Sequence, residues 1–225
     1  MNARQVAEHI ASTCESLYAI KLVRFYNTPH EVTANGRTRI SWRSSEAGSG
    51  HQHPFGSLEQ YLGWVKGGEF TCILFDNSLV RASYVCEGNS IVEHTLWYWP
   101  CPVKFPSPAE TLNDLCDGLA MCIESPRAAR DICELSLRSP MRFDFDPQQE
   151  REDHPLVHLH MQFEEARLHV NEAMCFTAFI KKVFRTFYLK KWLENRDVEL
   201  LHEQPIDQEE GQFDPMPHCL QVSWC

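Results

Sequence analysis

Residues 141–161 read MRFDFDPQQEREDHPLVHLHM, and the alternation in this stretch decides the fold that we predict for the whole chain. Side chains along a β-strand point alternately to its two faces, so the stretch predicts two strands joined by a polar loop. One face of this hairpin is apolar and is expected to form a wall of the core. The other face gathers charged and imidazole side chains, namely Arg142, Asp144, Asp146, His158 and His160.

An antiparallel register for this hairpin brings the polar side chains into pairs. The register that we expect places Asp144 opposite His158 and Arg142 opposite His160. Directly opposed residues have Cβ atoms about 4.5–5.5 Å apart, so their side chains can touch. A register shifted by two residues pairs Asp146 with His158 and keeps the same residues on one face.

Three interpretations of this polar face remain open. In the first, the face is structural, because Arg142 neutralises the aspartates and His158 hydrogen-bonds Asp144, as half-buried charges require. In the second, the histidines act as general acid and base on a phosphate ester or nucleotide, the aspartates orient them and Arg142 binds phosphate. In the third, aspartates and histidines hold zinc or manganese, although Arg142 on the same face disfavours an added cation.

These interpretations differ in where the polar face is expected to lie. An enzyme is expected to leave it in an open pocket, whereas a structural network is expected to be covered by a helix or by the C-terminal tail. If a reaction is catalysed, we expect the residues of the polar face to carry it. No cofactor is expected, apart from the divalent metal of the third interpretation.

Further basic residues are candidates for binding. His154 precedes Pro155, which restricts it to an extended conformation, so we interpret it as a residue that positions the loop beside the polar face. A predicted helix over 176–193 carries basic residues on the side away from its apolar stripe. The candidate binding residues are His154, Arg167, Lys181, Lys182 and Arg185.

Length, charge and cysteine usage limit the classes of protein. The chain has 225 residues, of which 43% are hydrophobic, which is enough for one large domain with a sizeable core. A formal net charge of −10 disfavours broad nonspecific binding to nucleic acid. No apolar run approaches the roughly 20 residues that span a bilayer, and no signal-peptide pattern is present. Ten cysteines without a CxxC motif favour free thiols in a reducing cytoplasm, so we expect a cytoplasmic protein that does not bind membranes.

The remaining chain predicts helices and strands without a regular βαβ alternation. We expect helices at 3–18, with Asn2 as a candidate cap, at 57–67, ended by Gly67-Gly68, and at 107–124 and 176–193. We expect strands at 20–27, 34–44, 69–75, 79–86, 90–99, 131–138 and 166–170. This order predicts one α+β domain over residues 1–194, with a mainly antiparallel β-sheet covered by helices, followed by an acidic tail over 195–225. We expect the acidic tail to contact the basic side of the 176–193 helix.

Other histidines and tryptophans have simpler interpretations. His94 shares its strand face with apolar residues, which favours a core histidine, whereas Trp97 and Trp99 face the other way and favour packing against a helix. The loop over 44–56 contains His51 and His53, which we interpret as solvated histidines.

Several segments between about residues 55 and 190 carry a resemblance to a known family. They are Tyr61-Leu62, the turn Asp76-Asn-Ser-Leu, His94-Thr-Leu, Pro100-Cys-Pro102, Arg142-Phe-Asp-Phe-Asp146, His154-Pro-x-x-His158-Leu, Arg167 and Phe179-Ile with Phe187-Tyr188. With these segments the chain resembles a bacterial family known as domain of unknown function two-two-nine-zero. The order of Asp and then His is also similar to that in a small toxin family of toxin–antitoxin pairs.

These resemblances imply a biological setting. They imply a bacterial toxin-like or antiphage-defence effector that acts on RNA or nucleotides by hydrolase- or nuclease-like phosphoester chemistry, with a protein partner encoded nearby. The alternative that they imply is a non-catalytic subunit or interaction module of such a complex, in which the polar face is structural.

Overall fold

The strands of this protein gather into one large sheet. The computed structural model describes residues 1–42, 57–107, 109–129, 133–136, 138–151, 154–161, 168–170, 173–206 and 221–222. Within these ranges ten strands form the sheet in the spatial order β1-β4-β5-β6-β9-β10-β11-β12, and β3 joins β5 while β2 pairs with β3. The strands are β1 Val23–Tyr26, β2 His30–Ala34, β3 Arg37–Ser41, β4 Cys72–Leu74, β5 Leu79–Glu87, β6 Ser90–Trp99, β9 Met141–Phe145, β10 Val157–Met161, β11 Leu168–Val170 and β12 Gln221–Val222.

The pairing of these strands confirms the predicted α+β class. Neighbouring strands run antiparallel, apart from β11 and β12, which are parallel. The predicted meander of three strands is present as β4, β5 and β6. Strand β2 was missed, because every one of its side chains is exposed and no apolar alternation marks it.

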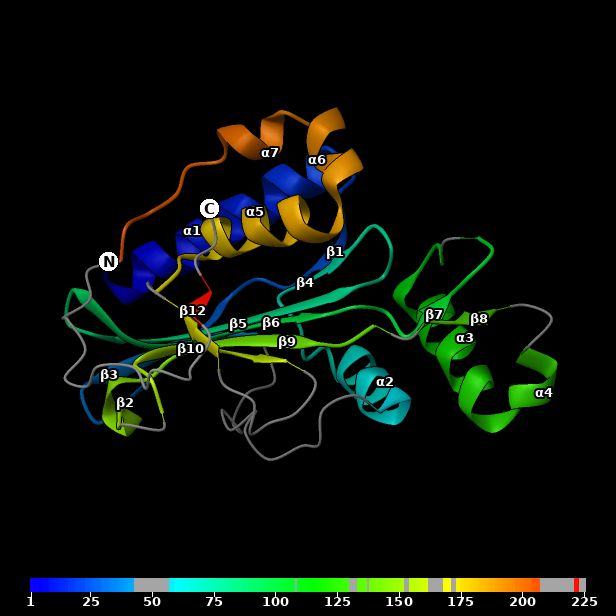
Figure 1. Ribbon diagram of the computed structural model, residues 1–225, viewed down its shortest axis with the longest axis horizontal. Helices are drawn as coiled ribbons and strands as arrows, with labels where there is room; N and C mark the ends of the chain where they lie inside the picture. Colours follow the sequence, from blue (N-terminus) through cyan, green and yellow to red (C-terminus); the bar gives the residue numbers. More distant parts are fainter. Residues whose placement is uncertain are drawn as a thin grey trace.

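Helices α1 (Ala3–Ala19) and α5 (Phe176–Phe187) cover one face of the sheet, as Figure 1 shows. As predicted, Asn2 caps α1, since its side chain accepts a hydrogen bond from the backbone N–H of Gln5. The two helices touch through Thr13 and Thr177, whose hydroxyl oxygens are 2.7 Å apart. The main core lies between these helices and the sheet.

The predicted 176–193 helix is two helices. Tyr188 leaves the helical conformation, with φ −131° and ψ 41°, and separates α5 from α6 (Leu189–Glu194). The Tyr188 hydroxyl instead reaches Asp76 and Ser78 at the turn between β4 and β5. A tertiary contact therefore interrupts an element whose sequence pattern is continuous.

Helix α2 (Leu58–Gly67) packs against the opposite face of the sheet. The ring of Trp64 on α2 lies 5.6 Å from that of Trp97 and 4.6 Å from that of Trp99, so the predicted packing of these tryptophans against a helix is confirmed. Gly68 ends the helix at φ 66°, a conformation that glycine adopts without strain.

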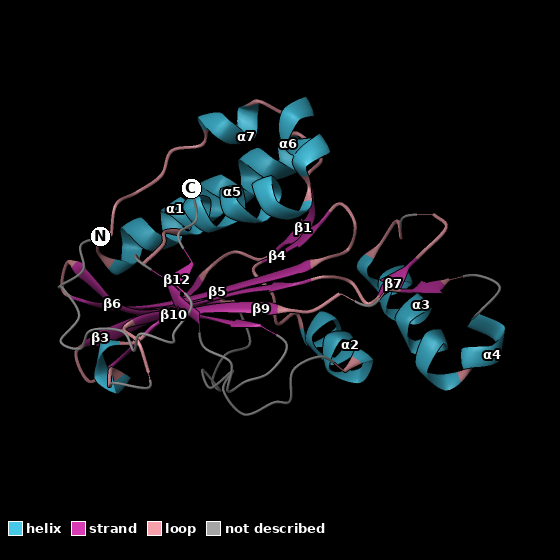
Figure 2. Ribbon diagram, viewed as in Figure 1, coloured by secondary structure: helices cyan, strands magenta, loops and turns pink. Residues whose placement is uncertain are grey.

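A small unit of α3 (Leu112–Glu124), α4 (Pro126–Ala129), β7 (Val103–Lys104) and β8 (Glu134–Leu135) lies beyond the end of the sheet (Figure 2). Helix α3 begins later than predicted, because Thr111 and Asp114 cap it reciprocally through their side chains and backbone N–H groups. Of the strand predicted at 131–138, the described residues contain β8, which pairs with the two-residue β7.

The acidic segment after α6 contacts α5, as predicted. In the helix α7 (Asp197–Leu200), Val198 is fully buried in the main core. Glu203 lies 2.8 Å from Lys181 and Glu199 lies 3.8 Å from Arg185. Among the described residues, no helix has the length and apolar character needed to cross a membrane.

Candidate functional site

The hairpin of β9 and β10 has the predicted register. His158 lies opposite Asp144 and His160 opposite Arg142. On its other edge β9 pairs with β6, which places Trp97 beside Arg142. We call Arg142, Asp144, His158 and His160 the hairpin cluster. It lies on the face of the sheet that α2 covers, while Phe143 and Phe145 face α1 and α5.

One carboxylate oxygen is the centre of the hairpin cluster. Asp144 Oδ2 accepts a hydrogen bond from Arg142 Nε at 2.7 Å and lies 3.2 Å from His160 Nε2 and 3.7 Å from His158 Nε2. Arg142 Nη2 lies 2.9 Å from His160 Nε2. A single guanidinium thus contacts both the aspartate and one of the histidines.

The hairpin cluster is buried. Asp144 is 4% exposed and His160 0%. Within the described chain, the ring of Trp97 lies 5.2 Å from the Arg142 guanidinium, and the ring of His154 lies 4.4 Å from that of His158. Burial is the feature that we expected of a structural network rather than of an open active site.

Burial and charge together set the protonation of the cluster. Burial alone raises the pKa of Asp144, but the contact with His160 and the charge of Arg142 outweigh it and hold this pKa well below its usual range. Burial lowers the pKa of His158 to about 3. Asp144 is therefore ionised and His158 neutral near pH 7.

The same cluster is the group in the described chain that is arranged to hold a metal ion. Asp144, His158 and His160 each offer one ligand atom, and these atoms all lie within 4.8 Å of one another. The structure also places His154, interpreted from the sequence as a residue that positions the loop, beside His158 in this group.

The other predicted site residues are not brought to the cluster. Asp146 lies just past the end of β9, and its carboxylate accepts the N–H of Gln148 at 3.1 Å to cap a short 3-10 helix. The backbone N–H of Asp146 donates to the carbonyl of Leu156, as the expected register requires, but its carboxylate is used for the cap. Lys181, Lys182 and Arg185 belong to α5, on the opposite side of the sheet. The remaining predicted residues Arg167, His51 and His53 lie outside the described residues.

Arg81 is a neighbour on the same face that the sequence analysis missed. It lies directly across from Trp97, which in turn lies across from Arg142. Its guanidinium carbon lies 4.0 Å from the ring of Trp42 and 3.7 Å from that of Trp64. The one sequence signal was an arginine within the mainly apolar strand β5.

The donors of Arg81 are incompletely used. The side chain is 2% exposed, and burial lowers its pKa to about 9. Its Nη2 lies 3.6 Å from Glu69, whereas Nε and Nη1 are buried without a hydrogen-bond partner in the described structure. Asp144 Oδ1 on the same face is likewise buried and without one.

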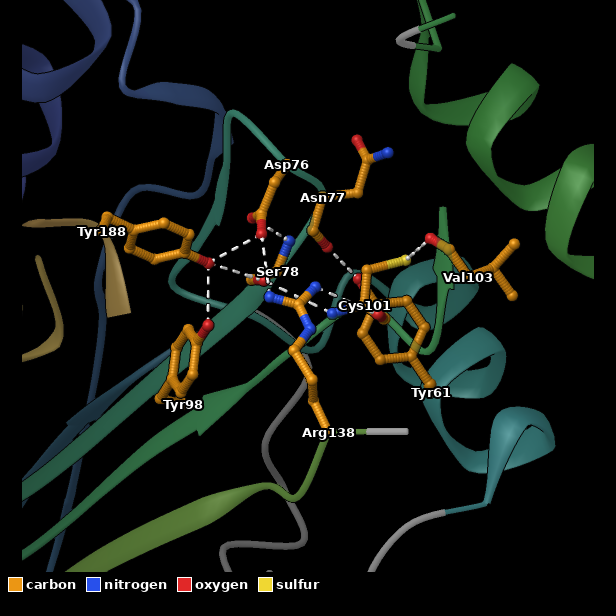
Figure 3. A network of polar contacts seen from close by, with 9 residues as sticks. All are labelled: Tyr61, Asp76, Asn77, Ser78, Tyr98, Cys101, Val103, Arg138 and Tyr188. Atoms are coloured by element: carbon orange, nitrogen blue, oxygen red, sulfur yellow. Dashed lines mark hydrogen bonds and ion pairs between the residues drawn. The ribbon is translucent and has the colours of Figure 1, made fainter. Parts of the chain in front are cut away.

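Figure 3 shows a second polar network, at the turn between β4 and β5, which was also missed. The Tyr188 hydroxyl lies 2.8 Å from Asp76 Oδ2 and 2.9 Å from Ser78 Oγ. It also lies 2.8 Å from the Tyr98 hydroxyl, while Arg138 Nη1 lies 3.3 Å from Asp76 Oδ2. Four separate segments of the chain meet in this network.

This second network holds the turn rather than activating a nucleophile. The Tyr61 hydroxyl donates to the carbonyl of Asn77, whose φ is 66°, and Arg24 donates to the Asn77 side chain at 2.8 Å. Burial raises the pKa of Cys101 to about 11, so its thiol stays protonated near pH 7. The segments around Tyr61, Asp76, Cys101 and Tyr188, which carried much of the family resemblance, therefore support the fold here.

Comparison with known proteins gives one informative match. The model of a family described as "Uncharacterized conserved protein (DUF2290)" matches residues 22–220, a range that includes the hairpin cluster, Arg81 and the second network. No curated protein and no solved structure matches the chain.

Proposed function

The chain belongs to the DUF2290 family of uncharacterized conserved proteins, and we propose that it is a bacterial effector that cleaves a phosphate ester in RNA or a nucleotide at the hairpin cluster. The proposed setting is toxin–antitoxin or antiphage defence. In this role Arg142 and Arg81 bind phosphate, and the histidines transfer the proton under the influence of Asp144.

The observation that supports this proposal is the set of unpartnered polar atoms on the face beneath α2. Arg81 Nε and Nη1 and Asp144 Oδ1 are buried without hydrogen-bond partners among the described residues. Each such atom costs about 1–3 kcal/mol, and a network that serves only stability is expected to satisfy its members. A ligand that carries several acceptor oxygens would supply the partners that Arg81 lacks.

The spacing of the arginines favours a phosphate-containing ligand. Arg81 and Arg142 are separated by the single strand β6, so their backbones lie about 10 Å apart, two steps of the usual strand spacing. Guanidinium groups bind phosphate oxygens through two parallel N–H groups, and the tryptophan rings beside them suit a nucleobase. This span is compatible with the phosphate and the base or ribose of one nucleotide.

The hairpin cluster supplies the acid–base chemistry in this proposal. His160 Nε2 contacts both Asp144 and Arg142, so a proton that it accepts from water or a ribose hydroxyl is stabilised by the carboxylate. Arg142 lies where it can stabilise the negative charge that develops on the phosphoryl oxygens.

A substrate panel with matched histidine variants tests the function. Purified protein is incubated with single-stranded RNA and with nucleoside phosphates, and cleavage is followed by chromatography. We expect His160→Ala to lose roughly 10²–10⁴ in rate, as removal of a general acid or base does. The control is His169→Ala, because His169 lies across from His158 on β11 without belonging to the cluster. Unchanged cleavage by His160→Ala would exclude the proposed catalysis.

A second candidate function is a non-catalytic subunit of a defence or toxin–antitoxin complex, which the burial of the hairpin cluster favours. In that case His160→Ala lowers the free energy of unfolding by about 1–3 kcal/mol, because Asp144 and Arg142 lose a partner. Growth inhibition on expression, measured per folded molecule, would then be the same for the variant and the unmodified protein.

A further inference from the structure

We propose that Asp144, His158 and His160 bind a divalent transition-metal ion of the zinc, manganese or iron(II) class. The proposal concerns the same residues as the proposed function, but it does not depend on any catalytic activity. Hydrogen bonds within the cluster fix which of its atoms carry lone pairs.

The backbone fixes the tautomer of His158. Its Nδ1 lies 2.8 Å from the carbonyl oxygen of Pro155, and a carbonyl can only accept, so Nδ1 carries the proton. In the neutral ring Nε2 is then an acceptor, and it faces Asp144 Oδ2 at 3.7 Å. Histidines that bind a metal usually donate a hydrogen bond from one ring nitrogen to a backbone carbonyl and bind the metal through the other nitrogen. In His158 these two nitrogens would be Nδ1 and Nε2.

Arg142 fixes the corresponding atom of His160. A guanidinium has donors only, so the contact of 2.9 Å between Arg142 Nη2 and His160 Nε2 requires a lone pair on that nitrogen. The same Nε2 lies 3.2 Å from Asp144 Oδ2. Two imidazole nitrogens and one carboxylate therefore direct lone pairs into one buried space.

The positive charge of Arg142 compensates only part of the repulsion between these lone pairs. Arg142 donates to Asp144 Oδ2 and to His160, and Asp144 Oδ1 remains buried without a hydrogen-bond partner in the ranges that the structure describes. Lone pairs that face one another in a buried site repel unless a proton or a cation lies between them. The geometry places a cation site where His158 Nε2 meets the Asp144 carboxylate.

The distances are compatible with one ion. Bonds of about 2.0–2.2 Å from a metal to nitrogen and oxygen place neighbouring ligand atoms roughly 3.0–3.5 Å apart. The carboxylate oxygen lies 3.2 Å and 3.7 Å from the two imidazole nitrogens, and all three ligand atoms lie within 4.8 Å of one another. Small side-chain shifts would bring all three to bonding distance of one ion. Two histidines and one carboxylate are a donor set for zinc, manganese or iron(II). Arg142 would then release His160 and keep its hydrogen bond to Asp144, as the outer partner of a ligand carboxylate.

Metal content and cobalt spectroscopy test the site without any substrate. Protein purified without chelator is analysed for bound metals, stripped with a chelator, and then titrated with Zn²⁺, Mn²⁺, Fe²⁺ or Co²⁺. We expect about one equivalent of metal per chain, a rise in Tm on reloading, and visible absorption from bound Co²⁺. The near-isosteric variants His158→Gln and Asp144→Asn are expected to lose all three signals, whereas His169→Gln keeps them.

The outcomes separate this proposal from the proposed function. Absence of bound metal in the unmodified protein, both as purified and after titration, would overturn the metal site even if the variants fail to fold. Equal metal content in His158→Gln would place the metal elsewhere and overturn it as well. RNA or nucleotide cleavage that survives chelation leaves the function standing without the metal, and a bound metal without cleavage leaves the metal standing without the function.

Discussion

His94 illustrates how one buried side chain makes stability depend on pH. The predicted core histidine is confirmed, since it is 1% exposed and its Nε2 accepts the N–H of Met174 at 3.0 Å. Burial lowers its pKa from 6.5 to about 4. As the pH falls from 6.5 toward 4, His94 is therefore protonated in the unfolded chain before it is protonated in the folded protein.

This difference in pKa makes the folded protein less stable at acidic pH. The stabilisation associated with neutral His94 is complete above pH 6.5 and is lost as the pH falls toward 4, by up to about 3 kcal/mol. His94→Gln keeps an acceptor for Met174 but does not titrate, so the free energy of unfolding should depend less on pH between 6.5 and 4. Urea denaturation across this range measures the difference. His30→Gln, at an exposed position of β2, is the control, and an equal slope in all three proteins would contradict the assignment.

At the scale of elements, the break between α5 and α6 depends on one hydroxyl. Tyr188→Phe removes the contacts to Asp76, Ser78 and Tyr98 while keeping the ring. We expect a loss of about 1–3 kcal/mol in the free energy of unfolding, because buried and half-buried polar groups lose a hydrogen-bond partner. Tyr18→Phe on α1, where the side chain is 53% exposed, should change little. Equal effects of both changes in thermal or urea unfolding would show that the network of Figure 3 does not hold the turn.

The sequence predicts elements well where local rules decide and less well where distant segments meet. The register of β9 and β10, the Asn2 cap and the Gly68 stop follow from alternation and backbone preference, and the structure confirms them. The burial of His160 and the break at Tyr188 depend on contacts from other parts of the chain. No local pattern encodes such contacts, so the composition of the hairpin cluster was predicted but its enclosure was not.

At the scale of the whole molecule, the acidic segment is attached to α5 by two unequal ion pairs. Lys181 is only 7% exposed and has Glu203 at 2.8 Å, whereas the pair of Arg185 and Glu199 is exposed and 3.8 Å apart. Removing the partner of a buried charge is costly, but exposed pairs contribute roughly 0–1 kcal/mol. We expect Glu203→Gln to lower the free energy of unfolding by about 1 kcal/mol and Glu199→Gln by less.

Limited proteolysis gives a second measure of the same attachment. Cleavage within 195–206 should be faster in Glu203→Gln than in Glu199→Gln, while the rest of the protein stays intact. If both variants are cleaved at the rate of the unmodified protein, the segment is held by apolar contacts such as that of Val198, and the ion pairs are incidental.

The contact between α1 and α5 has a consequence for how the protein is made. Thr13 and Thr177 are 164 residues apart, so α1 leaves the ribosome well before its partner α5 has been made. At about 5–20 residues per second this interval is on the order of 10–30 s. During that time the apolar stripe of α1, which is Val6, Ile10, Cys14 and Leu17, has no finished core to enter. Nascent chains of this protein are therefore expected to be clients of chaperones that shield apolar helices until synthesis has passed α5.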